Sequence, residues 1–516
     1  MNFSHSDIEH IESLGLSLKI VKKQIKTYKG SQNYINLSAS ATIGNGILKL
    51  SESELNDFVN YYDEEKGALK VVKFTPASGA ASRMFKLLHE FLSQYEPQKE
   101  TINSYINKNK SVELFLFFVT IEKLPFHDDV VDKMQIAMPD YDLLTLDQRR
   151  LLFVKSILEE DYLNYLNIPK GLLPFHQYKN HTSTAFEEHL FEAEKYASID
   201  GKAQLQFTVS KAHLKQFETK WASIQRIVES KTNTKFELSF SYQESNTNVL
   251  AVDLKNQPYR LNEKLFFRPS GHGALIQNLN HIDADIIFVK NIDNVVVDKY
   301  LDQIARYKKV LAGVLLKLQF QVFKYAKILE SSEISEVQIL EIVDFLTQQL
   351  NIRISSEFDK YAYKYQIDYL KSKINRPIRI CGMVENEGEP GGGPFWVKAE
   401  NGEISLQIVE ASQVNQKLSR QKTILMNATH FNPVDIVCGI KNYKGETYDL
   451  KQFIDPKTYF ITTKTKYGKQ LKTLEKPGLW NGSMAHWNTV FVEVPIITFN
   501  PVKTVNDLLK FTHQAK

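Results

Sequence analysis

The stretch KFTPASGAASRMFK, residues 73–86, is informative about the fold because it places six small residues between a proline and an arginine. It follows a β-type run at residues 69–74, and a helical pattern begins after it. Open α/β folds use a strand, a loop of small residues and a helix to bring backbone N–H groups against a phosphate. Small residues also permit simple close packing of a strand on a helix. The stretch therefore predicts a strand-to-helix loop, used either for phosphate or for packing.

Composition excludes several classes of protein. The chain has 516 residues, and its 64 basic and 60 acidic residues leave a charge of +4, which gives no electrostatic footprint for nucleic acid. Only Cys381 and Cys438 are present, which is too few for a disulfide framework and indicates a reducing cytoplasm. The apolar windows 114–121 and 310–323 are too short or are broken by Lys317, so no membrane segment is expected. We expect a cytoplasmic protein.

Strand and helix patterns alternate over much of the chain. Strand-type runs recur at 205–210, 235–243, 264–269, 284–293 and 377–384, with helix-compatible stretches between several of them. Alternation of this kind favours a mostly parallel sheet. We expect an N-terminal helical region (1–66), a core (67–440) with helical insertions at about 84–165 and 296–375, and a C-terminal α/β extension (441–516) that completes the site.

Two later stretches have the residues of an anion or nucleotide site. A proline fixes the backbone just before Lys170, and a lysine held by such a turn can serve as a point charge for a phosphate. Farther along, Gly271 and Gly273 flank His272, and glycines there suit close contact with a base or a sugar. A solvated loop lysine and a structural histidine are the alternatives.

Polar residues follow the buried-type strand expected at 284–293. Its end reads KNIDN, residues 290–294, and ligands in open α/β sheets lie outside the carboxyl ends of strands. Asp293 is a hard oxygen ligand of the kind that Mg²⁺ takes beside substrate phosphates. A polar turn after a strand is the alternative. The sequence thus makes this turn a candidate for a metal or a ribose.

An acidic and glycine-rich segment lies after the strand expected at 377–384. Glu385, Glu387 and Glu389 alternate before the glycines at 391–393, which suggests a flexible acidic loop able to close over a polar ligand or a second Mg²⁺. A solvated turn is equally compatible with this composition.

The order of these motifs resembles the sugar-nucleotide pyrophosphorylases, uridylyltransferases that join a nucleotide to a sugar 1-phosphate. Their loop of the form G-G-x-G-T-R corresponds to residues 78–83, and the Pro-Lys that follows it corresponds to 169–170. The UDP-sugar branch has P-x-G-H-G, N-I-D-N and P-V-K-T-x-x-D-L-L elements, matched at 269–273, 291–294 and 501–509. The whole chain resembles more closely an uncharacterised bacterial family of unknown function.

The resemblance implies a three-layer α/β/α, Rossmann-like nucleotide-diphospho-sugar transferase fold with helical insertions. It also implies an enzyme that uses Mg²⁺, a nucleoside triphosphate and a sugar 1-phosphate, and that releases pyrophosphate. The segment at 407–414 is similar to the V-E-x-S segment that contacts sugar in that family. The implied roles are catalytic for Arg83, Lys170 and Lys503; nucleotide binding for Ala77, Ser78, Gly79, Ser82, Gly271, His272 and Gly273; metal binding for Asp293; and sugar binding for Asn291 and Glu410.

The chain departs from the family pattern in two ways. Ser78 and Ala81 replace signature glycines, and the segment between Arg83 and Lys170 is far longer than the usual loop. Two other functions stay open: a glycosyltransferase on the same fold, and a nucleotide-binding protein without catalysis. A glycosyltransferase usually has an Asp-x-Asp metal motif, whereas DAD at 283–285 lies at the start of its strand.

Overall fold

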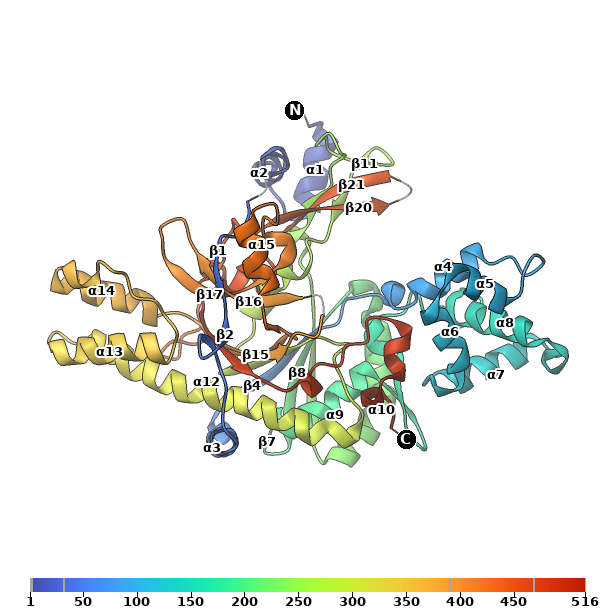
Figure 1. The fold of residues 1–516 in the computed structure, drawn as a ribbon, viewed down its shortest axis with the longest axis horizontal. Coiled ribbons are helices and arrows are strands. Elements are labelled where there is room, and N and C mark those ends of the chain that lie inside the picture. Colours follow the sequence, from blue (N-terminus) through green and yellow to red (C-terminus); the bar gives the residue numbers. More distant parts are fainter. Residues whose placement is uncertain (1–2, 31–32, 389–390, 467–468, 516) are drawn as a thin grey trace. The chain divides into compact units, whose positions relative to one another are not determined.

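The computed structural model describes residues 3–30, 33–388, 391–466 and 469–515 (Figure 1). The chain divides into two units, each made of three separate segments. Unit 1 comprises Met1–Phe74, Ser241–Val289 and Tyr307–Thr498, and unit 2 comprises Thr75–Phe240, Lys290–Arg306 and Phe499–Lys516. The expected consecutive regions 1–66, 67–440 and 441–516 remain a prediction. In the described part of the chain, no helix has the length and hydropathy needed to cross a membrane.

Unit 1 contains most of the strands. Its helices are α1 (His5–Ser13), α2 (Leu18–Lys29), α3 (Glu52–Glu65), α11 (Leu275–Asn280), α13 (Glu336–Gln348), α14 (Tyr363–Ile374) and α15 (Ser419–Met426), together with most of α12 (Leu301–Leu329). Its strands are β1 (Leu37–Ser40), β2 (Thr42–Ile43), β3 (Gly46–Leu48), β4 (Val71–Pro76, which ends in unit 2), β10 (Val249–Leu250), β11 (Arg260–Leu261), β12 (Lys264–Leu265), β13 (Phe267–Arg268), β14 (Ile286–Lys290, which also ends in unit 2), β15 (Ile378–Glu385), β16 (Gly392–Lys398), β17 (Ile404–Glu410), β18 (His430–Phe431), β19 (Asp435–Gly439), β20 (Phe460–Lys466), β21 (Lys469–Glu475) and β22 (Asn488–Glu493).

The main sheet of unit 1 has the strand order β2-β3-β22-β15-β19-β14-β4. Neighbours pair in parallel from β2 to β15 and again between β14 and β4, while β15 and β19 are antiparallel. Every residue of β14 is buried, as expected for a parallel strand that is covered on both faces. The protein is thus a mixed α/β protein with a large, parallel-rich sheet, and the strands expected at 284–293 and 377–384 are confirmed as β14 and β15.

The main sheet is covered on both faces within unit 1. Lys308 of α12 contacts Asp435 of β19, which places this long helix on one face (Figure 1). On the other face, Cys381 and Met383 of β15 share a hydrophobic core with Trp396 of β16 and with residues of β17 and α11. A second sheet, β1-β16-β17, therefore lies over part of this core.

The glycine run at 391–393 corrects the expectation of a flexible loop. Gly392 and Gly393 are buried and begin β16, and a methyl group on Gly392 would lie 2.6 Å from Cγ2 of Ile408 in β17. Glycine is needed here because the two strands approach closely. Glu385 is the last residue of β15, and Glu389 lies outside the described residues.

Unit 2 combines a short sheet with a group of helices. Its helices are α4 (Lys86–Gln94), α5 (Ile102–Asn109), α6 (Val112–Val119), α7 (His127–Ala137), α8 (Leu146–Leu158), α9 (Ala185–Ala197) and α10 (Leu214–Thr232), and its strands are β5 (Pro174–Gln177), β6 (Thr182–Thr184), β7 (Ser198–Ile199), β8 (Lys202–Val209) and most of β9 (Lys235–Tyr242). β8 pairs with β7 and β9, and rings from β8, β9, α9 and α10 pack together.

The helices α4–α8 lie together in Figure 1 and share one hydrophobic core. Val502, Val505 and Leu508 of the C-terminal segment are part of the same core. The segment 84–165 therefore contains helices and no strand, and the end of the chain is fixed against it.

Two local expectations differ from the structure. The described residues of the segment 1–66 form three helices, with Ser51 capping α3, but they also form the short strands β1–β3. The run at 264–269 forms two strands of two residues with different partners, instead of one strand. Strands of two or three residues are too short to show the alternation of apolar and polar residues that predicts a strand.

The ion pair between Lys308 and Asp435 yields a stability prediction. Both side chains are almost fully buried, at 0% and 1% exposure, so Asp435→Asn removes a carboxylate charge that lies against a buried ammonium. We expect the free energy of unfolding to fall by about 3–5 kcal/mol, measured by urea denaturation. The control is Glu357→Gln, which removes an exposed ion pair with Lys360 and should change stability by less than about 1 kcal/mol. Equal, small effects in both variants would contradict this account of how α12 is attached.

Candidate functional site

The small-residue loop begins where β4 ends at Pro76. The N–H of Ala77 donates to the carbonyl oxygen of Thr208 at 2.8 Å, and Ala77 and Ala81 are both buried. A methyl group built on Gly79 would meet nothing within 4 Å. The exposed residues of the loop are Ser78, Gly79, Ala80, Ser82 and Arg83. Ala77 and Ala81 are thus packed inside the protein, whereas the other residues of the loop expose backbone groups and the Arg83 side chain.

This loop is joined directly to the Pro-Lys stretch of unit 2. The carbonyl oxygen of Gly79 accepts a hydrogen bond from the N–H of Lys170 at 3.1 Å, and Ala80 forms a β-bridge with Pro169. The Lys170 ammonium lies 2.6 Å from Oδ2 of Asp293, and the two side chains are only 14% and 20% exposed. Three stretches that are far apart in sequence therefore meet around one ion pair.

Asp293 lies three residues beyond the end of β14. Its carbonyl oxygen accepts a hydrogen bond from the N–H of Val502 at 3.1 Å, so the C-terminal segment is attached to the same turn. Lys503 follows directly, and its ammonium lies 5.3 Å from the centroid of the Phe499 ring. Asn291, in the same turn, is half-buried. Arg83, Lys170, Asn291, Asp293 and Lys503 thus all belong to unit 2.

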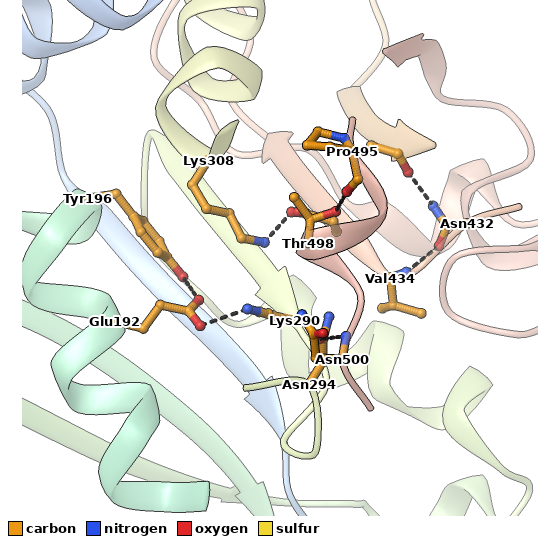
Figure 2. Close-up of polar contacts among 12 residues, drawn as sticks. Glu192, Tyr196, Lys290, Asn294, Lys308, Asn432, Val434, Pro495, Thr498 and Asn500 are labelled. Carbon is orange, nitrogen blue, oxygen red and sulfur yellow. Dashed lines mark hydrogen bonds and ion pairs between the residues drawn. The ribbon is translucent and has the colours of Figure 1, made fainter. Parts of the chain in front are cut away.

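Buried contacts hold this turn on both sides. Figure 2 shows Glu192 of α9 between Tyr196 and Lys290, the last residue of β14. The Lys290 ammonium lies 2.7 Å from Glu192, both side chains are 1% exposed, and the Tyr196 hydroxyl donates to Glu192 at 2.8 Å. After the turn, Oδ1 of Asn294 accepts the N–H of Asn500 at 2.7 Å. The position of Asp293 is therefore fixed by the protein before any ligand binds.

The side chains fit only one kind of magnesium site. In the residues that the structure describes, no group of three or more His, Cys, Asp or Glu side chains is arranged to hold a metal. Asp293 offers a single carboxylate, one oxygen of which contacts Lys170. Mg²⁺ that is bound mainly by substrate phosphates and water needs only one or two protein carboxylates. The residues fit such an ion and do not form an all-protein cage.

A second cluster, in unit 1, surrounds His272. The imidazole stacks on the indole of Trp480 with ring centroids 4.1 Å apart, and its Nδ1 accepts the N–H of Leu479 at 3.0 Å. Burial lowers the pKa of His272 to about 4, so the ring is neutral at pH 7. Because Nδ1 accepts, the proton is on Nε2, which lies 3.8 Å from Oε1 of Glu410. His272 is therefore held as a neutral donor.

The glycines beside His272 have contacts within the protein. Gly271 has φ +77°, and a methyl group there would lie 2.4 Å from Oε2 of Glu475. A methyl group on Gly273 would lie 2.1 Å from the carbonyl oxygen of Pro477. Because both glycines lack a side chain, the segment that leads to Trp480 can pack against them.

Glu410 borders a cavity of about 370 Å³ in unit 1. Its Oε1 accepts a hydrogen bond from Nδ2 of Asn481 at 2.9 Å. The cavity is lined on one side by Phe395 and Phe431, and His430 lies in its wall. The sequence-based candidates His272 and Glu410 thus lie together, next to this cavity, which has both apolar and polar walls.

Sequence reasoning missed two residues that build this cluster. Trp480 was not singled out, although it provides the stacking surface. Arg379 of β15 is fully buried, and its guanidinium donates to the carbonyl oxygen of Trp480 at 2.5 Å and to Oγ1 of Thr489 at 2.9 Å. A charged residue inside an otherwise apolar strand, IRICGMV, was the signal that could have identified Arg379.

The acidic residues at the other end of β14 are already paired. Asp283 contacts Lys70 and Lys441 at 3.0 and 3.1 Å, and Asp285 contacts Lys441 at 3.0 Å and accepts the N–H of Lys70. These carboxylates therefore form ion pairs that link the start of β14 to Lys70, which precedes β4, and to Lys441, which follows β19.

Comparison with solved structures gives matches at low sequence identity, three of which are described here. The UDP-glucose pyrophosphorylase from Leishmania major is 11% identical, with a TM-score of 0.42 over 98% of this chain and 79% of that one. The UDP-glucose phosphorylase from Trypanosoma brucei is 13% identical, with a TM-score of 0.44 over 98% and 77%. The uridine diphosphate N-acetylglucosamine pyrophosphorylase from Trypanosoma brucei is 11% identical, with a TM-score of 0.47 over 95% and 74%.

Comparison with the curated proteins finds no match to this chain. One family model, described as a domain of unknown function (DUF4301), matches residues 4–514. Since that match spans nearly the whole sequence, the chain belongs to the DUF4301 family.

Proposed function

We propose that this protein is a nucleotidyltransferase that joins a nucleoside triphosphate to a sugar 1-phosphate and releases pyrophosphate. The proposal rests on one observation. In unit 2, the exposed loop at 78–83, the Lys170–Asp293 pair and the segment that contains Lys503 lie together. Phosphoryl-type transfer needs positioning and charge stabilisation more than covalent chemistry. These groups supply both without a nucleophile or a general base.

In the proposed reaction, an oxygen of the sugar 1-phosphate attacks the α-phosphorus of the triphosphate. A new P–O bond forms, the bond from the α-phosphorus to the β-phosphate oxygen breaks, and pyrophosphate leaves with the electron pair. Arg83 and Lys170 bind the triphosphate and the leaving pyrophosphate, and Lys503 neutralises the acceptor phosphate. When bound at Asp293, Mg²⁺ supplies positive charge to phosphate oxygens. The Lys170–Asp293 contact keeps the ammonium in place until a phosphate arrives.

The remaining roles are assigned within each unit. Open backbone at Ser78, Gly79 and Ser82 meets the nucleotide in unit 2, and the buried Ala77 supports this loop through its N–H. In unit 1, His272 binds the nucleotide, with Gly271 and Gly273 packed against the protein's own segment at 475–477, and Glu410 binds sugar hydroxyls beside the cavity of about 370 Å³. Asn291 is assigned to the sugar as well. The proposal includes a three-layer, Rossmann-like nucleotide-diphospho-sugar transferase core and a cytoplasmic setting.

The two alternative functions, a glycosyltransferase and a binding protein without catalysis, are distinguished by different observations. A glycosyltransferase would use the Asp-x-Asp carboxylates, but Asp283 and Asp285 are engaged by Lys70 and Lys441, which favours the nucleotidyltransferase. A binding protein without catalysis would take up nucleotide and release no pyrophosphate.

The first prediction concerns Asp293. A screen of nucleoside triphosphates against sugar 1-phosphates with Mg²⁺ should find one pair that releases pyrophosphate, and Asp293→Asn should lower that turnover roughly a hundredfold or more. Asp298→Asn, at an exposed carboxylate in the same segment, is the matched control and should retain full turnover. Release of pyrophosphate at equal rates in all three proteins would remove Asp293 from the mechanism.

The second prediction concerns Arg83, which is exposed and has no ion-pair partner in the described part of the chain. Arg83→Met should weaken triphosphate binding by roughly tenfold to a hundredfold, because it removes a charge-assisted hydrogen bond worth about 1.5–3 kcal/mol. Calorimetric titration gives the dissociation constant, and the melting temperature should not change. Lys86→Met, which removes a neighbouring exposed charge, should have little effect. An equal loss of affinity in both variants would indicate only a general electrostatic effect.

The third prediction separates stacking from hydrogen bonding in unit 1. Trp480→Ala removes the ring under His272 and should weaken nucleotide binding by roughly tenfold, since an aromatic pair is worth about 0.5–1.5 kcal/mol. Trp480→Phe preserves a stacking ring and should retain most of the affinity, measured by the same titration. Unchanged affinity in the alanine variant would exclude the His272 cluster from nucleotide binding.

A further inference from the structure

Unit 1 contains a second, larger cavity that none of the proposed roles uses. Its volume is about 610 Å³, within the range of small-molecule sites. The walls come from the turn after α13, the end of α14, the β16–β17 hairpin and residues 485–489, which include the start of β22. Within the described residues, its lining includes neither His272 nor Glu410.

The lining of this cavity is rich in cations. Arg353, Lys373, Arg376, Lys398 and Lys457 lie in its walls, together with the carboxylates Glu400, Glu403 and Asp455. Lys373 pairs with Glu403 at 2.6 Å, and Lys457 pairs with Glu400. In the part of the chain that the structure describes, Arg353, Arg376 and Lys398 have no carboxylate within ion-pair distance. The cavity therefore has an uncompensated positive charge.

The two guanidinium groups are held by uncharged neighbours. Nε of Arg376 donates to the carbonyl oxygen of Ser372 at 2.7 Å, and burial lowers the pKa of Arg376 although Glu403 partly opposes this effect. The Arg353 guanidinium lies 4.3 Å from the centroid of the Trp396 ring. The Arg376 guanidinium, which is partly buried and has no carboxylate partner in the described part of the chain, favours an incoming anion because the anion provides the missing countercharge.

We propose that this cavity binds a small phosphorylated molecule, at a site distinct from the one proposed for the transferase reaction. A phosphate accepts planar, bidentate hydrogen bonds from arginine, and its double negative charge matches the excess of five cations over three carboxylates in the lining. The cavity is larger than a phosphate ion needs, and asparagine side chains such as Asn33 and Asn401 in its wall can bind the hydroxyl groups of the rest of the ligand.

The test uses inorganic phosphate as the probe and tryptophan fluorescence as the signal. The chain has four tryptophans. Replacing Trp221 and Trp480 by Phe in the full chain leaves Trp487, which lines the cavity, and Trp396, which contacts Arg353. Phosphate is titrated to 50 mM, on the order of the concentrations that weak anion sites require, at constant ionic strength so that general screening does not change.

We expect a saturable fluorescence change that Lys398→Glu and Arg353→Met each weaken at least tenfold. Both residues are exposed, so the variants should fold, and their melting temperatures verify this. Arg83→Met, in the unit 2 loop, should bind the probe as the parent does. The proposal is overturned if no saturable change occurs, if both cavity variants bind as the parent does, or if Arg83→Met alone abolishes the signal. This result does not depend on whether pyrophosphate release is observed.

Discussion

The ion pair between Lys170 and Asp293 is the contact on which the proposed site depends. Removing two charges from water is unfavourable, and the pair is retained only because backbone hydrogen bonds hold both residues in place. Lys170 is bonded through its N–H to Gly79 of the loop, and Asp293 accepts from Val502 of the C-terminal segment. The pair thus ties together three stretches of unit 2 and leaves a lysine and a carboxylate positioned for phosphate chemistry.

In unit 1, the buried guanidinium of Arg379 has a comparable structural role. It is fully buried and its hydrogen bonds go to a carbonyl oxygen and a hydroxyl, so its charge is balanced by dipoles rather than by an anion. One of these bonds fixes the backbone of Trp480, whose ring stacks on His272. The other goes to Thr489, which lines the larger cavity. One buried side chain therefore contacts both regions of unit 1 to which we assign ligands.

The sequence predicted the parts of this structure that depend on local pattern. β14 was predictable because a continuous run of Ile, Phe and Val specifies a buried strand, and β15 because apolar residues predominate in it. The strands β1–β3 and the strand start at Gly392 were not. β1 and β3 pair with β16 and β22, which lie far along the chain, β2 has only two residues, and glycine does not favour a strand. Periodicity gives no information about such partners.

The same limit applies to the candidate site. Composition and turn chemistry singled out Lys170, His272 and Asp293 individually, but only the resemblance to a known family suggested that they act together. Trp480 and Arg379 were missed because their importance arises from contacts across the fold, with His272 and with the Trp480 carbonyl group. Conversely, the glycines at 271 and 273 were assigned to a ligand, whereas the structure brings the protein's own segment at 475–477 against them.

The central claim is most directly tested by the reverse reaction. Radiolabelled pyrophosphate would be incubated with Mg²⁺ and a panel of nucleotide sugars, and the nucleotides would then be separated and counted. The account predicts that label enters a nucleoside triphosphate only when a nucleotide sugar is present, and that Lys170→Met abolishes this transfer. No labelled triphosphate from any nucleotide sugar, in a protein whose melting temperature nucleotides nevertheless raise, would contradict it and would identify a binding protein instead.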